Sequence, residues 1–477
     1  MELELGLRPD DAPRLRRLRL LAPLRSGRPR SHGVRIVWHD GPDRALARQG
    51  LALAEQRPVW RLERLLPDGQ TWSPGTRAPV LATGHDPSAL GQALPEPLVP
   101  VAALIGRTTS LCLNTERGPV GMTLLNGTVR AVTSEHQVCR IGLEGAPEAV
   151  QPLALALAGE IWLAVPCASL AAEAAAAVSG AEPPPRHEGA AELPAGVSVA
   201  EAFAHVVGHL TDVILYFAPK AARAGDGPEP VHQMRVAVRR LRSVIKVFGS
   251  AIDTPDVAAA DRGLKALGAR LAPARDWDVF VTETGALVAE TFPAEQRVRH
   301  LLGAAERRQR ACHRELRSFL DSVEFRRLGV ELACLSGSRQ VVAEAGETDL
   351  LTFAAGVLHK RLGKLSQVED DLTTLEPGAL HALRLRAKQL RYAAEIFAPL
   401  YSGKATHRFI HRLSRLQDRL GTLNDAAVAS DLIAGLGGNH AFASGLVLGF
   451  IGAHNSGKRE RIAEAWHKFR QAVPFWG

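Results

Sequence analysis

The sequence is poor in the residues that build metal and disulfide scaffolds. It has five cysteines among 477 residues, and no two of them form a C-x-x-C pair. An odd count without such a pair argues against a zinc site and against a disulfide framework, and it favours a reducing compartment. Aromatic residues make up only 5% of the chain, which argues against a stacking platform for single-stranded nucleic acid.

The chain also lacks a long uninterrupted apolar run. Its longest apolar stretch, residues 153–178, is broken by Glu160, Pro166 and Glu173, so no segment predicts a membrane-spanning helix. The first residues, MELELGLRPDD, are acidic where a secretion signal is basic and then apolar. These absences predict a soluble, cytoplasmic protein without a membrane partner.

Positive charge and length are what the chain does have. Its 58 Lys and Arg residues exceed its 50 Asp and Glu residues, for a formal charge of +8, which permits a polyanionic partner without demanding one. The length exceeds that of one ordinary domain. The stretch SGAEPPPRHEGAAELPAG has the composition of an exposed linker. We therefore predict domains at 1–178 and 198–477, joined by a linker at 179–197.

The part before the linker has a mixed pattern. Short apolar segments such as VRIVWHD and TSLCLN alternate with turn-rich stretches, and residues 146–159 and 167–180 are rich in Ala and Leu. This predicts an α+β domain with an antiparallel sheet and at least two helices. The Asn126-Gly127 pair within MTLLNGTVRAV predicts a β-hairpin.

The part after the linker predicts an all-α domain that contains a repeat. Apolar residues recur at helical spacing nearly to the end. VHQMRVAVRRLRSVIKVF at 231–248 aligns with LHALRLRAKQLRYAAEIF at 380–397 at an offset of 149, and the same register later pairs Leu267 with Leu416. We predict two pseudo-symmetric helical bundles, at about 198–335 and 348–477.

Basic residues recur at matching positions in both copies of the repeat. Their spacing of i, i+3, i+7 and i+10 places them on one helix face, over a rise of about 15 Å. The apolar stripe runs one residue earlier, about 100° away, so the basic stripe flanks the core. Like charges packed in this way repel one another and favour a bound anion. The candidate residues are His232, Arg235, Arg239, Arg242, His381, Arg384, Lys388 and Arg391.

Simpler interpretations exist for each of these residues. A basic stripe on one helix is most often a solvated face, and the duplication is what favours a site. A single histidine is more often structural than a ligand, and both interpretations stay open for His232 and His381. The equivalent residues Asp276 and Asp425 are interpreted as helix N-caps.

At these motifs the chain resembles the CHAD family, the conserved-histidine α-helical domains. The resemblance covers about residue 199 to the C-terminus, with LAPARDWDV and LQDRLGTLNDAAVA as further matching motifs. It implies two pseudo-symmetric helical bundles around a basic cavity that binds inorganic polyphosphate. One position departs from the first copy, because Lys388 stands opposite Arg239; lysine contacts phosphate as a point charge without the fork of arginine.

The part before the linker resembles a CYTH-type triphosphate tunnel domain in which functional positions have changed. The family's opening E-x-E-x-K strand reads ELELG, which keeps Glu2 and Glu4 but has Gly6 for the lysine. Other positions have changed too: Ala54 and Gln56 for arginines, Arg140 and Gly142 for acids, and Leu170 for a base. Triphosphate hydrolysis in a tunnel needs both a carboxylate cluster for a divalent metal and several bases. We predict a degenerate, inactive domain, with Glu2, Glu4 and Glu144 as weak metal candidates.

The sequence therefore predicts a non-catalytic polyphosphate-binding protein that needs no cofactor. Association with polyphosphate granules is implied by the resemblance. One alternative is an enzyme, a metal-dependent triphosphatase acting through Glu2, Glu4, Glu144, Arg64 and Arg107. A second is nucleic-acid binding by the basic helices, although no helix-turn-helix, zinc-finger or RNA-recognition signature is present.

Overall fold

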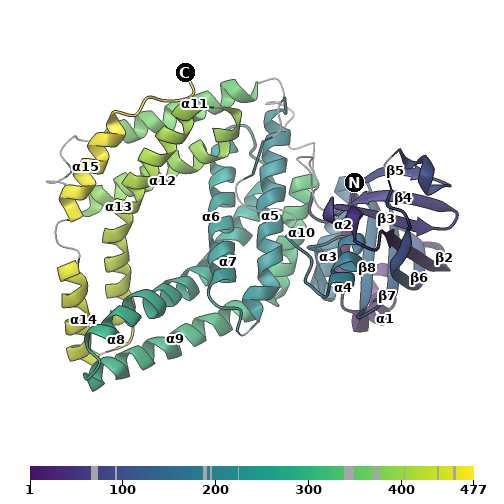
Figure 1. The fold of residues 1–477 in the computed structure, drawn as a ribbon, viewed down its shortest axis with the longest axis horizontal. Helices are drawn as coiled ribbons and strands as arrows, with labels where there is room; N and C mark the ends of the chain where they lie inside the picture. The colour runs from purple at the N-terminus through teal and green to yellow at the C-terminus, as the bar shows by residue number, and fades with distance from the viewer. Residues whose placement is uncertain are drawn as a thin grey trace.

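The computed structural model has a sheet part and a helical part (Figure 1). It describes the backbone of residues 1–477 except 66–72, 92–93, 186–190, 194–195, 224, 338–348, 369–371, 373–376, 402, 438–439 and 455–457. The side chains of residues 377, 422–426, 454 and 458–459 are also outside the description. Much of the predicted linker thus lies within the described residues.

The sheet part is one antiparallel sheet of nine described strands, in the order β5-β4-β3-β2-β6-β7-β8-β1-β9. The strands are β1 (Glu2–Leu7), β2 (Arg25–Asp40), β3 (Leu51–Gln56), β4 (Val59–Arg64), β5 (Val80–Gly84), β6 (Val99–Thr115), β7 (Gly118–Ala131), β8 (Glu135–Gly145) and β9 (Leu163–Ala164). The helices of this part are α1 (Ala12–Leu15), α2 (Ala45–Arg48), α3 (Pro147–Glu160) and α4 (Leu170–Ser179). The predicted α+β class is confirmed, as are both Ala/Leu-rich helices.

Strand β1 shows how the sequence assigns its two faces. Alternate residues of ELELGL face opposite sides, and Leu3, Leu5 and Leu7 are buried in the core that the sheet shares with α3. Glu2, Glu4 and Gly6 therefore lie on the other face of the sheet. β8 pairs beside β1 in a register that sets Gly6 opposite Arg140, so the guanidinium of Arg140 shares this face.

The predicted hairpin at Asn126-Gly127 is wrong. β7 passes straight through these residues, and the turn lies earlier, between Thr115 and Gly118. Gly127 pairs with Gly106 of β6, and a Cβ on Gly106 would lie only 2.6 Å from the Gly127 Cα. Gly127 therefore allows β7 to approach β6 closely and does not form a turn.

The helical part contains α5 (Val199–Ala222), α6 (Glu229–Phe248), α7 (Pro255–Val279), α8 (Ala286–Thr291), α9 (Gln296–Leu320), α10 (Val323–Gly337), α11 (Leu350–Ser366), α12 (Pro377–Phe397), α13 (Lys404–Ala434), α14 (Ala441–His454) and α15 (Lys458–Arg470). A π-helical turn, Phe280–Gly285, joins α7 to α8. Helix α5 begins in a capping box between Ser198 and Glu201. The predicted all-α class is confirmed.

The repeat is visible in where the helices begin. α7 begins at Pro255 and α13 at Lys404, so the two starts differ by the 149 residues of the sequence repeat. α6 and α12 begin 148 residues apart and end 149 residues apart, at Phe248 and Phe397. The two copies thus fold into equivalent helices in equivalent register.

Both N-cap predictions are wrong. Asp276 lies inside α7, which is capped by Thr254, and position 425 lies inside α13; the Asp425 side chain is outside the described residues. Helix α13 runs without a break through residues 420–426. The motif around each aspartate is a continuation of a long helix, so polar residues there need another explanation.

Helix α10 was missed in the sequence, and it joins the two parts. Leu328, Leu332 and Leu335 belong to the core of the helical part. Val330, Ala333 and Cys334, on its other side, belong to the core under β1 and α3. Because one helix serves two cores, the helical and sheet parts pack against each other directly (Figure 1).

Among the described helices, α5 alone has the length and hydropathy of a membrane span. Two thirds of its apolar window is buried inside the protein, where Phe203, Val207 and Ile214 contribute to the helical core. α5 is therefore accounted for as a core helix.

Candidate functional site

The two basic helices of the repeat, α6 and α12, meet through their C-terminal ends. The equivalent residues Phe248 and Phe397 have ring centroids 5.8 Å apart, and both rings contact Phe353 of α11. All three phenylalanines have ordinary aromatic contact geometry. The pseudo-symmetry of the sequence thus becomes a physical contact, which brings the second halves of both basic stripes together.

The predicted residues lie at the margin of the core. His232, Arg235, Arg239 and Arg242 on α6 are half-buried, as are Arg384, Lys388 and Arg391 on α12, whereas His381 is exposed. The apolar neighbours Met234, Leu241, Leu383 and Leu390 are fully buried. The stripes therefore flank the core, as their spacing predicts. His232 and His381 lie near the N-terminal ends of helices that meet through their C-terminal ends.

Arginines from both copies gather where α6 and α12 meet. The Arg239 guanidinium lies 5.5 Å from the ring centroid of Tyr392, and that of Arg391 lies 5.8 Å from the same ring. These distances fit cation–π contacts. The Glu395 carboxylate forms an ion pair with Arg391, with 3.0 Å between Arg391 Nε and Glu395 Oε1. The other oxygen of Glu395, Oε2, lies 3.7 Å from the guanidinium of Arg240 on α6. One carboxylate thus spans the two copies.

Burial and crowding disfavour charge in this cluster. Burial lowers the pKa of Arg239 from its usual value, and the nearby Arg235, Arg391 and Arg240 lower it further. Burial also lowers the pKa of His232, and the positive charge of Arg275 on α7 acts in the same direction. The cluster has positive charge that its own carboxylates do not balance.

Two further arginines are held by carboxylates of α7. Arg242 Nε lies 2.8 Å from Asp261 Oδ1, and Arg235 lies 3.3 Å from Asp276 Oδ1. Asp276 therefore positions an arginine, instead of capping a helix. In each case a short carboxylate fixes a long flexible side chain, which reduces the entropy that a bound anion would have to remove.

Sequence reasoning missed four members of the cluster: Arg240, Asp261, Tyr392 and Glu395. The Arg391–Glu395 pair has the i, i+4 spacing of a helical ion pair, so that signal was present. Glu395 also breaks the repeat, because Lys246 stands at its equivalent position. The contacts of Arg240 and Tyr392 depend on the packing of α6 against α12, which no local pattern predicts.

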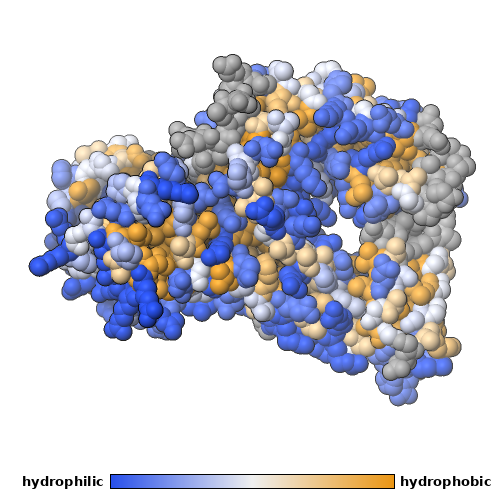
Figure 2. Space-filling view, turned by 180° about the vertical axis from the view of Figure 1, so that it is seen from behind, coloured by the Kyte–Doolittle hydropathy of each residue, from blue (hydrophilic) through white to orange (hydrophobic). Residues whose placement is uncertain are grey.

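An opening passes through the helical part in the space-filling view, and hydrophilic residues gather along much of its described rim (Figure 2). In the ribbon view, helices α6, α7, α9, α12 and α13 surround the centre of this part (Figure 1). A flexible polyanion can approach basic side chains at such a rim.

The face of the sheet that carries Glu2 and Glu4 has a different charge arrangement. Glu2 Oε1 lies 2.7 Å from Arg77 Nε. Glu4 lies 4.0 Å from Arg140, which also binds Glu173 of α4. Burial raises the pKa of Glu4, and Arg140 opposes that rise. Arginine side chains thus already pair with the retained carboxylates.

These residues do not fit a divalent metal. The implied tunnel metal would need several free carboxylates, but arginines neutralise both Glu2 and Glu4. Within the described part of the chain, no group of three or more His, Cys, Asp or Glu residues is arranged to hold a metal ion. Arg140 Nη1 lies only 3.6 Å from where a Cβ on Gly6 would be. Its guanidinium therefore lies beside the position where the family's lysine would begin.

The remaining tunnel candidates are spread over the sheet. Glu144 is exposed on β8 opposite Glu2. Arg107 lies on β6 and Arg64 at the end of β4. β6 is separated from β1 by β7 and β8, and β4 lies still further along the sheet. The five residues of the enzyme alternative thus come from four different strands.

The comparison with protein families decides the identity of the helical part. The model of the CHAD domain matches residues 199–434. This chain contains a CHAD domain. The match begins with α5 and ends with α13, so it includes both basic helices. The antiparallel sheet before the CHAD domain is consistent with the tunnel-like CYTH fold that its first strand suggests.

A solved structure agrees for the helical part. The CHAD domain from the plant Ricinus communis is similar with a TM-score of 0.51 and 26% identity, over 61% of this chain and 97% of that one. PptA from Streptomyces chartreusis has a TM-score of 0.43 and 18% identity, over 58% of this chain and 99% of that one. A putative adenylyl cyclase from Hippeastrum, described as having a dominant triphosphatase activity, has a TM-score of 0.26 and 16% identity, over 39% of this chain and 99% of that one. TM-scores below 0.5 do not establish a shared fold.

Curated relatives include two uncharacterised proteins from strains of Mycobacterium tuberculosis. Each is 27% identical over 267 residues, which cover 53% of this chain and 50% of the relative. The chain thus spans about half the length of the curated relatives it matches.

Proposed function

We propose that this protein binds inorganic polyphosphate through the basic stripes of α6 and α12 and does not hydrolyse it. The observation that supports this most is the arginine cluster at the junction of the two copies. Arg235, Arg239, Arg240, Arg242 and Arg391 gather around three carboxylates. A phosphate chain would neutralise the excess through charge-assisted hydrogen bonds.

The same geometry favours a chain of phosphates over nucleic acid. Single-stranded nucleic acids are bound by stacking their bases on exposed aromatic rings, but the aromatic residue of this cluster, Tyr392, is buried beneath arginines. Polyphosphate needs only charge and hydrogen-bond donors. Binding of this kind would also recruit the protein to intracellular polyphosphate granules.

The proposed absence of hydrolysis is based on the charged residues of the sheet. Arg77 and Arg140 neutralise the carboxylates that a catalytic metal would need. The triphosphatase alternative requires these carboxylates to release their arginines and to gather around a metal. The rearrangement would take Glu4 away from the largely buried Arg140, which would keep its ion pair with Glu173.

Calorimetric titration of the full chain with long-chain polyphosphate, repeated over a range of salt concentrations, tests the proposal. Affinity should fall steeply with salt, because each phosphate contact releases a counterion. Competition between polyphosphate and duplex DNA at matched salt tests the nucleic-acid alternative. An assay of phosphate release from tripolyphosphate with Mg²⁺ or Mn²⁺ tests the enzyme alternative. A binding curve insensitive to salt, or turnover lost in a Glu2→Ala/Glu4→Ala variant, contradicts the proposal. The full chain is required because α10 contributes to both cores.

A further inference from the structure

A large cavity lies where the two parts of the protein meet, away from the junction of α6 with α12. Its volume is about 970 Å³, at the upper end of the range for small-molecule sites. The end of β1, the start of β8 and helix α4 line one side; the end of α5 and the α9–α10 turn line the other. Interfaces between domains are a preferred location for ligand sites.

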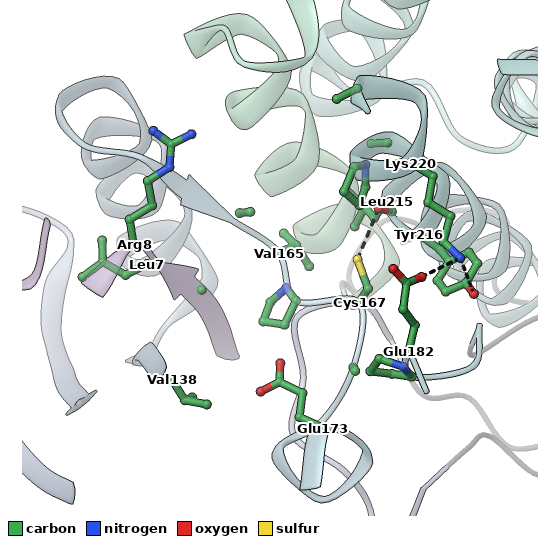
Figure 3. A pocket seen from close by; sticks show the side chains of 18 of the residues that line it. Leu7, Arg8, Val138, Val165, Cys167, Glu173, Glu182, Leu215, Tyr216 and Lys220 are labelled. Carbon is green, nitrogen blue, oxygen red and sulfur yellow. Dashed lines mark hydrogen bonds and ion pairs between the residues drawn. The ribbon is translucent and has the colours of Figure 1, made fainter. Parts of the chain in front are cut away.

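The middle of this cavity is apolar. Leu7, Val138 and Val165 of the sheet part face Leu215 and Phe325 of the helical part, and Figure 3 shows the first four of these around the open volume. Such walls favour an apolar ligand body, because its burial releases water from both surfaces.

Charged groups also line the cavity, with an excess of positive charge. Among the lining residues, six are Arg or Lys and three are Asp or Glu. Lys220 Nζ lies 2.9 Å from the Tyr216 hydroxyl and 3.0 Å from the Glu182 carboxylate. Glu182 also forms an ion pair with Arg223, at 2.6 Å. Across the cavity, Arg8 lies 4.7 Å from the Trp162 ring centroid and pairs with Asp321. Figure 3 shows Arg8 and Lys220 on opposite sides.

From this arrangement we infer that the cavity binds a small amphipathic anion, with an alkyl or acyl body between the two parts and a phosphate or carboxylate head at the basic residues. The apolar walls supply affinity for the body, and the positive excess selects an anion over a cation of the same shape. This site is separate from the polyphosphate site and does not depend on it.

Gly329 offers a way to close the cavity without removing a charged group. It lies on α10, and a Cβ there would lie 3.6 Å from Leu215 and 4.0 Å from Val165, both of which line the cavity. Gly329→Ala adds a methyl in ordinary contact, whereas Gly329→Leu projects a side chain into the apolar middle. Both alanine and leucine favour a helix more than glycine does. The alanine variant is thus the matched control.

Dodecyl phosphate, kept below its micelle concentration, is the probe for the test, with calorimetric titration of the full chain as the readout. We expect saturable binding that Gly329→Leu weakens at least tenfold and that Gly329→Ala changes less than twofold. Dodecanoate in place of dodecyl phosphate shows which head group is preferred. Dodecyltrimethylammonium, a cation with the same chain, should not bind. Protection of Cys167 from maleimide, read by peptide mass spectrometry, localises the probe because Cys167 lines the cavity.

Arg223→Gln keeps the test decisive should Gly329→Leu fold poorly. The Arg223 side chain is more than half exposed. Its loss should weaken the binding of dodecyl phosphate about tenfold and leave polyphosphate binding unchanged. Equal binding of the cation, unchanged affinity in both variants, or no binding of either anion overturns the inference. Polyphosphate titrations of the same samples show independently whether the proposed function holds.

Discussion

The helical and sheet parts both place arginines beside carboxylates, yet the balance between them differs. At the junction of α6 with α12, five arginines gather around three carboxylates, and burial with mutual repulsion lowers the pKa of Arg239. On the sheet, Glu2 pairs with Arg77, and Arg140 lies between Glu4 and Glu173. The first arrangement has two more arginines than carboxylates, and the second has one more carboxylate than arginines. On the proposed function, the sign of this charge excess, more than the number of charged residues, separates a binding site from a structural network.

The largest effect on the helical side should come from reversing charge in both copies. Arg235→Glu with Arg384→Glu should weaken polyphosphate binding about a thousandfold, because each lost charge-assisted contact contributes about 1.5–3 kcal/mol. Titration calorimetry at fixed salt measures the loss. Arg307→Glu with Arg308→Glu, on the exposed side of α9, is the control and should change affinity only a few-fold. Equal losses in the two double variants would mean that only net charge matters.

The two parts should respond in opposite ways to the loss of one arginine. Arg140→Ala leaves Glu4 and Glu173 without their buried partner, and should lower the free energy of unfolding by about 3 kcal/mol without changing polyphosphate affinity. Denaturant unfolding measures this loss, which should shrink from pH 8 to pH 5, because burial raises the pKa of Glu4 and this carboxyl group becomes protonated as the pH falls. Arg239→Met should leave stability within about 1 kcal/mol, since burial already disfavours its charge, and should weaken polyphosphate about tenfold.

If Arg140→Ala weakened polyphosphate binding as strongly as Arg239→Met does, the sheet would belong to the binding site. The proposed distinction between the arginine cluster of the helical part and the ion pairs of the sheet would then fail.

The sequence predicted one part of the molecule better than the other, for a physical reason. The register of the repeat and the one-residue offset between basic and apolar stripes are local helical properties, and α6, α7, α12 and α13 follow them. Arg240 and Tyr392 joined the cluster through packing between helices distant in sequence. The Asn126-Gly127 turn failed because Gly106, twenty residues earlier, needed a close neighbour. Asp276 was misread because an N-cap and an ion-pair partner look alike in one sequence.

The pH dependence of binding sharpens the comparison further. Burial and nearby arginines hold the pKa of His232 below its usual value in the ligand-free protein, so near pH 7 this histidine carries less charge than an ordinary histidine. A bound phosphate favours the charged form and raises that pKa, so binding takes up a proton and affinity rises as pH falls. Between pH 7.5 and 5.5 we expect about a fivefold gain, measured by titration in buffers of matched ionic strength. His232→Gln should flatten the profile, whereas a gain that survives this change would assign the proton to another group.

The smallest effect should come from exchanging the one unequal pair of the repeat. Lys388 stands where the first copy has Arg239, and a guanidinium can bind phosphate through two parallel hydrogen bonds where an ammonium cannot. Lys388→Arg should therefore tighten polyphosphate binding about two- to threefold, and Arg239→Lys should weaken it by about as much. The double exchange, compared with both single variants by titration, asks whether the positions are equivalent. Affinity near that of the original protein means that both copies contact the same phosphate chain alike. If the double variant binds polyphosphate as weakly as Arg239→Lys alone, the half-buried position 239 beside Tyr392 contributes most of the binding free energy. The two copies would then be equivalent in sequence but unequal in their contribution to binding.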